Sequence, residues 1–170
     1  MQAVLSVIAA ANADVLVLQS IDWDHELRAL TALNAALGPG AQPYPHLFAL
    51  QPNTGVPTGL DMDGNGRFGR AGDAQGFGDF LGQGGMAVLS RLPIDRARAV
   101  ALTEILWHDV PHAVLPQHPN GDPFPSAEAL GAQRLSQTAH WDVPLVLPGG
   151  ERLHLLTHHA SPPVLSLIHI

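Results

Sequence analysis

Hydrophobic residues in the first part of the chain follow the spacing of helices and one strand. Residues 2–11 are apolar and rich in alanine, and leucines from Leu27 to Leu37 recur at helical spacing, so two helices are predicted. Asp24 stands where a side chain can cap the second helix, which we expect to run from there to about Leu37. Between the helices, residues 15–19 form an unbroken apolar run that is typical of a strand covered on both faces.

The rest of the chain contains further runs of strand length separated by turn residues. A tight turn at 149–150 predicts that the last two runs form a hairpin, and a Leu-Pro turn at 92–93 predicts a second hairpin. Strands with a few flanking helices predict a mixed α+β domain with a largely antiparallel core. The predicted strands cover residues 46–50, 85–90, 97–102, 138–147 and 153–159, with 85–90 paired to 97–102.

A long segment without apolar periodicity interrupts this pattern at residues 52–85. Eleven of the seventeen glycines lie in it, together with four aspartates. Loops of this length in a compact domain are usually functional or disordered, and the aspartates favour a functional loop ordered by an ion. A second irregular segment, rich in proline and histidine, is predicted over residues 108–132.

Composition narrows the classes of function. With 170 residues, of which 46% are hydrophobic, the chain fits one domain with a sizeable core. The absence of cysteine excludes disulfides, zinc-thiolate sites and thiol nucleophiles. A net charge of −7 without a cluster of basic residues argues against tight nucleic-acid binding. An acidic enzyme can still act on phosphate esters when bound cations supply the positive charge.

The glycine-rich loop contains the first half of an EF-hand-like calcium motif. Oxygen donors stand at positions 1, 3 and 5, and a glycine at position 6 turns the chain. The glutamate expected at position 12 is replaced by Gly72, but an aspartate follows at once and can close the site. The alternative is a Gly/Asp-rich turn without an ion, and we favour calcium because so long a loop needs something to order it. The predicted ligands are Asp61, Asp63, Asn65, Asp73 and the backbone carbonyl of Arg67.

Alternation along the last strand places His159 on the same face as Leu155 and Thr157. A titratable group at the end of an apolar strand face suits a general acid or an electrostatic partner of a phosphate. The alternative is a chance histidine at a hairpin end, since the chain has ten. His154 and His158 lie about 13 Å apart along a strand, so they cannot share one ion.

Asp22 and Asp24 follow the first strand. Helix capping is the favoured interpretation of this pair, and a metal site is the alternative.

Five segments match motifs that occur together in one family. Residues 13–19 (ADVLVLQ) resemble a first core strand written PDV-apolar-LQE, and residues 85–94 resemble a G-apolar-AILSRFPI hairpin. Residues 157–163 look like a strand end with a catalytic histidine, in a bacterial subgroup with H-x-[ST]-P-P, and residues 58–66 and 134–144 are also similar to that subgroup. The chain thus resembles the endonuclease/exonuclease/phosphatase superfamily, which has the deoxyribonuclease-I-like fold.

This resemblance implies a four-layer α/β/β/α sandwich, with residues 1–164 as one partial domain and 52–85 as an insert loop. It also implies hydrolysis of phosphoesters. Magnesium or manganese would polarise the phosphate, and His159, by motif position, would support the in-line attack of water. Calcium in the insert would be structural. The expected partner is a phosphoester substrate, with nucleic acid among the candidates, and no apolar run is long enough to span a bilayer.

The sequence departs from the family pattern in three places. Ser20 stands where the family has a metal-binding glutamate, and a hydroxyl is a poor magnesium ligand, so Asp22 is the candidate replacement. The family's later Asp-x-Asn and Asp-His pairs are not present, and neither is the strand expected before Met1. Residues 165–170 do not continue the pattern and are interpreted as a non-native tail. We therefore expect a domain incomplete at both ends, inactive by itself and prone to aggregation.

The leading functional hypothesis is a metal-dependent phosphodiesterase or nuclease-like hydrolase. A catalytically degenerate calcium-binding module on the same scaffold is the alternative, which Ser20 permits, and an adhesion domain with a calcium clip is a third. The retained His159 favours the enzyme. A calcium loop of moderate affinity suits the millimolar calcium outside cells, so we expect an extracellular or periplasmic location.

Overall fold

The computed structural model describes residues 2–38 and 43–160, and two three-stranded antiparallel sheets form its centre. The first sheet has the order β1-β3-β2 and the second the order β4-β5-β6. The prediction of a mixed α+β chain with antiparallel sheets is therefore confirmed. The strands are β1 (Val15–Ile21), β2 (His46–Phe48), β3 (Gly85–Ser90), β4 (Val100–Ala101), β5 (Ala139–Val146) and β6 (Arg152–His159).

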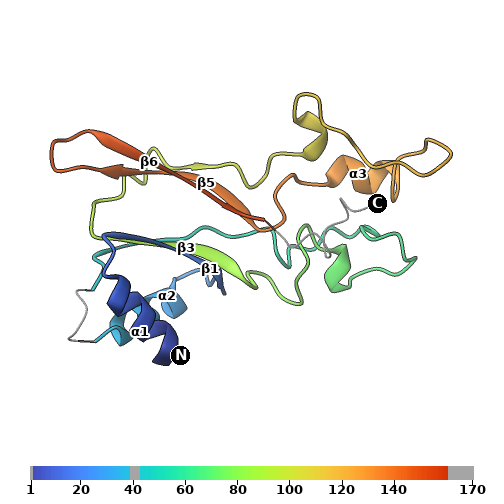
Figure 1. The fold of residues 1–170 in the computed structure, drawn as a ribbon. Helices are drawn as coiled ribbons and strands as arrows, with labels where there is room; N and C mark the ends of the chain where they lie inside the picture. Colours follow the sequence, from blue (N-terminus) through green and yellow to red (C-terminus); the bar gives the residue numbers. More distant parts are fainter. Residues whose placement is uncertain (1, 39–42, 161–170) are drawn as a thin grey trace.

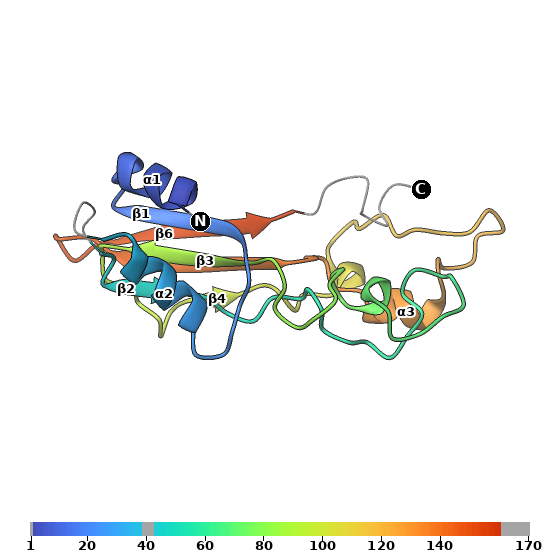
Figure 2. The ribbon, with the colours of Figure 1, turned by 90° about the horizontal axis from the view of Figure 1, so that it is seen from below.

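The two sheets lie face to face, and helices α1 (Gln2–Ala11) and α2 (Arg28–Ala36) cover the other face of the first sheet (Figures 1 and 2). Every residue of β3 is buried, because this strand has packing partners on both sides. Its Val88 joins the core between the sheets, where Trp141 of β5 is fully buried. Its Leu89 joins the cluster beneath the helices, with Ile8 of α1. The sequence predicts such a strand at residues 15–19, where β1 forms. Covering on both faces is wrong there, because β1 is an edge strand and its Val17 is 39% exposed.

Helix α2 begins at Arg28 rather than at Asp24, so its predicted start is four residues early. The capping prediction for Asp24 holds. Its carboxylate accepts hydrogen bonds from the backbone N–H groups of Arg28 (2.8 Å) and Ala29 (2.9 Å), which have no partner inside the helix. These donors, led by the Ala29 N–H, lower the pKa of Asp24 below its usual range.

The predicted pairing of residues 85–90 with 97–102 is wrong. Strand β4 pairs with β5 in the second sheet, with Val100 opposite Asp142 and Ala101 opposite Trp141. The reason is that β1 and β2 occupy the two edges of β3 and leave no edge for a third partner. The chain therefore crosses to the second sheet after β3.

Two irregular regions gather beyond the end of the sheets at which β6 ends (Figure 1). Residues 52–85 contain one short turn of 3₁₀ helix before β3 starts, η1 (Ala71–Asp73), in agreement with the predicted loop. The second region contains another such turn, η2 (Trp107–Asp109), and a short helix that the sequence did not predict, α3 (Ala127–Ala132). The hydroxyl of Ser126 caps α3 by accepting the N–H of Ala129.

Helices long and apolar enough to cross a bilayer are not found in the described residues. The predicted tail at 165–170, and most of the motif at 157–163 beyond His159, lie outside those residues.

Candidate functional site

His159 is the last residue of β6, opposite Ala139 of β5. The strand alternates as the sequence predicts, because Thr157 is buried, His158 is exposed and His159 is half-buried. The imidazole therefore lies on the side of β6 that faces the first sheet, at the end where the irregular regions gather.

The end of β1 lies against the end of β6. The side-chain amide of Gln19 donates a hydrogen bond to the backbone carbonyl of His158 at 3.0 Å. The next residue, Ser20, has a positive φ of 59° and interrupts the pairing register between Gln19 and Ile21. This bulge leaves Ser20 exposed beside the strand that carries His159. The structure thus brings the family's glutamate position and the predicted catalytic histidine to one strand end.

The environment of His159 favours an uncharged ring. Burial, and then the neighbouring His158, lower the pKa of His159 below its usual value. Its Nδ1 atom is buried and has no hydrogen-bond partner among the described residues. A neutral imidazole near pH 7 can accept a proton, which is the role that a general base requires.

The described residues at this strand end do not fit a magnesium site. Ser20 offers a hydroxyl where a carboxylate is needed, and one carboxylate oxygen of Asp22 accepts the backbone N–H of Gly84 at 2.8 Å. No group of three histidine, aspartate or glutamate side chains with converging ligand atoms occurs here within residues 2–38 and 43–160. Any catalytic cation would need ligands other than these.

Three aspartates of the insert converge instead. Ligand oxygens of Asp61, Asp63 and Asp73 all lie within 4.8 Å of one another, so the group could bind a metal ion. Gly64 and Gly66 have positive φ values of 73° and 76° and turn the chain between the first two aspartates and the third. Oxygen ligands in this number suit a hard cation, in agreement with the predicted motif.

Backbone N–H groups hold two of these carboxylates in place. Asp61 accepts the N–H groups of Gly66 (2.8 Å) and Asn65 (3.1 Å), and the Gly66 donor contributes most to lowering the pKa of Asp61. Asp73 is only 2% exposed. It accepts the N–H groups of Met62 and Arg70 (2.9 Å). These two N–H donors hold the buried Asp73 carboxylate in place beside the other aspartates.

Asn65, another predicted calcium ligand, uses its amide oxygen in a local hydrogen bond in this structure. The amide oxygen of Asn65 accepts the backbone N–H of Arg67 at 2.8 Å, while its NH₂ group donates to Asp63. Gly72 has a steric role, because a Cβ at this position would lie 2.5 Å from a carboxylate oxygen of Asp63. Glycine at position 12 of the motif therefore lets Asp63 approach the backbone.

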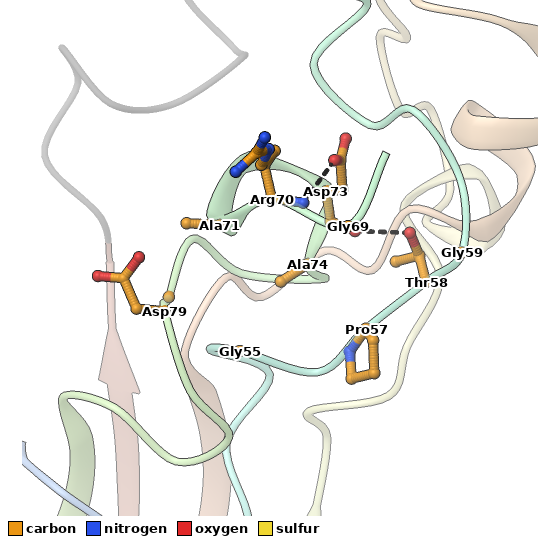
Figure 3. Close-up of a pocket in the computed structure, with 11 residues that line it drawn as sticks. Gly55, Pro57, Thr58, Gly59, Gly69, Arg70, Ala71, Asp73, Ala74 and Asp79 are labelled. Carbon is orange, nitrogen blue, oxygen red and sulfur yellow. Dashed lines mark hydrogen bonds between the residues drawn. The ribbon is translucent and has the colours of Figure 1, made fainter. Parts of the chain in front are cut away.

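A pocket of about 310 Å³ adjoins the aspartate group. Its polar lining includes Thr58, Arg70, Asp73 and Asp79, as Figure 3 shows. The hydroxyl of Thr58 donates to the backbone carbonyl of Asp73 at 2.6 Å, which fixes one wall of the pocket to the predicted metal site.

Sequence reasoning missed Asn53, which is fully buried where the two irregular regions meet. Its side-chain NH₂ donates to the carbonyls of Thr103 (2.8 Å) and Ser136, and its side-chain oxygen accepts a hydrogen bond from Arg134 at 2.6 Å. Its backbone N–H donates to the carbonyl of Thr138, directly before β5. Asn53 therefore attaches the insert to the strand that pairs with β6.

The family model of the Endonuclease/Exonuclease/phosphatase family matches residues 1–165. Because this match spans almost the whole chain, the protein belongs to that family. Comparison with curated proteins and with solved structures found no match. Membership suggests phosphoesterase activity and phosphoester substrates.

Proposed function

We propose that this protein is a metal-dependent phosphoester hydrolase in which His159 takes part in the chemistry. The observation that carries the proposal is the hydrogen bond from Gln19 to the backbone of His158, which holds the β1 end beside the histidine strand. Family membership supports the reaction class. A bound cation, held by ligands other than Ser20 and Asp22, would supply charge stabilisation of the phosphate.

His159 itself would act on the attacking water. Burial lowers the pKa of His159 and so favours the neutral ring, which can accept a proton as the water attacks phosphorus and later release it to the leaving group. The pairing of β6 with β5 fixes the backbone up to His159, the last residue of the strand. The fixed position of the His159 backbone restricts where the attacking water must lie.

The test is hydrolysis of bis-p-nitrophenyl phosphate and of plasmid DNA with magnesium, manganese or calcium. His159→Ala should lower the rate by roughly 10²–10⁴-fold, the usual contribution of a general acid–base group. His154→Ala is the matched control, because His154 lies on the opposite face of β6 and contacts Asp142. An active protein whose His159→Ala variant keeps its full rate would overturn the role of this residue.

The second candidate function is a calcium-binding module on the same scaffold. The converging oxygens of Asp61, Asp63 and Asp73 favour it, and the serine at position 20 is compatible with loss of catalysis. Calcium would order the insert and bring the carbonyl of Arg67 and the amide oxygen of Asn65 to the ion. Complete inactivity with every metal, together with calcium-dependent stability, would select this function over the hydrolase.

We expect calcium to raise the melting temperature of the wild-type protein by several degrees, because the ion binds only the ordered insert. Asp61→Asn removes a charged ligand and should abolish most of that rise. Asp79→Asn is the control, since Asp79 lines the pocket but is not one of the three converging aspartates. Thermal unfolding with calcium and with a chelator measures the effect, and an equal rise in Asp61→Asn would contradict the site.

We propose that residues 1–164 form part of a four-layer α/β/β/α family domain, that 52–85 is the insert of the bacterial subgroup, and that the protein acts outside the cytoplasm. The two facing sheets with helices on one side support the first proposal, and the aspartate-rich insert supports the other two.

A further inference from the structure

Two histidines face each other on the outer surface of the second sheet, away from the predicted active site. His140 of β5 and His158 of β6 are direct partners in the antiparallel register. Their ring centres lie 5.1 Å apart and their planes are inclined by 51°. His158 is exposed and His140 is half-buried, so solvent reaches the pair.

The spacing suits two ligands of one ion. With zinc–nitrogen bonds of about 2.0–2.1 Å and a tetrahedral angle, two imidazoles on one ion have ring centres roughly 5 Å apart. Strand pairing holds the two backbones in place, so only side-chain rotation is needed to bring one nitrogen from each ring to a common point. Hard cations prefer oxygen, whereas imidazole suits zinc, copper and nickel.

The two rings are not committed to other partners. In the part of the chain that the structure describes, neither ring forms a hydrogen bond or an ion pair. The other charged or titratable groups of β5 and β6 on this outer face are Asp142, His154 and Arg152. His154 and Asp142 bind each other, with a distance of 2.9 Å from Nδ1 to the carboxylate, and Arg152 binds Asp95. Burial and the adjacent His158 also lower the pKa of His140, which favours the neutral form that binds metal.

We propose that His140 and His158 form a two-nitrogen surface site for a borderline transition-metal ion such as zinc, with water as the remaining ligands. The site is separate from the aspartate group of the insert, which offers only oxygen. It does not depend on phosphoesterase activity.

The experiment is a calorimetric titration of the full chain with zinc, in excess calcium so that the aspartate group is already occupied. The wild-type protein should bind one zinc ion at this site. His140→Gln and His158→Gln should each weaken binding by at least roughly tenfold, since even the loss of an outer-shell partner costs about that much. His154→Gln, a histidine on the same face of the same strand, should bind within a factor of about two of wild type.

Copper(II) provides a spectroscopic readout that altered folding would not imitate. Electron paramagnetic resonance should show two nitrogen ligands in the wild-type protein and one in each single variant. Absence of zinc binding by the wild type would overturn the proposal. So would unchanged binding in both single variants, or an equal loss in His154→Gln.

Discussion

At the scale of single residues, hydrogen bonds from backbone N–H groups lower the pKa of two aspartates. Asp24 and Asp61 both have a lowered pKa because backbone donors favour the carboxylate. In each case the donors come from residues two to five positions later, so local sequence sufficed to predict their roles. Local sequence could not predict the role of Asp22. Its hydrogen-bond partner Gly84 is 62 residues away, and no local spacing indicates that contact.

The cap at Asp24 makes a prediction about pH. A carboxylate with a lowered folded pKa stabilises the fold above its unfolded pKa, near 3.8, and loses this contribution as the pH falls through the folded value. Asp24→Ala should therefore lower the melting temperature by a few degrees at pH 7 and by much less at pH 2. Thermal unfolding at both pH values measures this difference. Asp79→Ala is the control, since no hydrogen bond to the Asp79 carboxylate occurs within the described residues.

At the scale of elements, two glycines with opposite surroundings allow a matched test. A Cβ on Gly76 would lie 1.8 Å from the backbone oxygen of Gln137, where the insert meets the segment before β5. A Cβ on Gly131, in helix α3, would meet nothing within 4 Å. Replacing glycine by alanine should thus lower the stability of the protein at position 76 and raise it at position 131.

We expect Gly76→Ala to destabilise the protein by roughly 1–3 kcal/mol through overpacking. Gly131→Ala should stabilise it by about 0.5–1 kcal/mol, because alanine loses less backbone freedom in a helix. Urea unfolding of both variants gives the two free energies of unfolding. A neutral Gly76→Ala would mean that the insert does not pack against the start of β5 in solution.

The same scale shows which parts of the fold the sequence could predict. The apolar run 85–90 and the hairpin at 149–150 were found because burial on both faces and turn residues leave local patterns. The strand partner of Val100 could not be predicted in this way, because strand pairing depends on which sheet edges remain free after distant segments have paired. The aspartate site followed from spacing within the insert, whereas Asn53 has side-chain partners 50 and 83 residues away.

At the scale of the whole molecule, β3 contributes buried residues to both hydrophobic clusters. Val88 packs in the cluster that contains Trp141, and Leu89 packs in the cluster beneath the helices. Both side chains are fully buried. Neither cluster can lose its packing without exposing a face of the same strand, so the helices and the two sheets should unfold as one cooperative unit.

Leu89→Ala tests this coupling, because it removes apolar contacts only on the helix side of β3. The expected loss of stability is about 2–5 kcal/mol, the usual range for a buried leucine. If the clusters are coupled, the fluorescence of Trp141 on the far side should report the same shift as circular dichroism at far-ultraviolet wavelengths. Replacing Trp23 and Trp107 by phenylalanine isolates the Trp141 signal. A Trp141 transition that stayed at its original urea concentration while the helical signal moved would show that the two sides of β3 unfold independently.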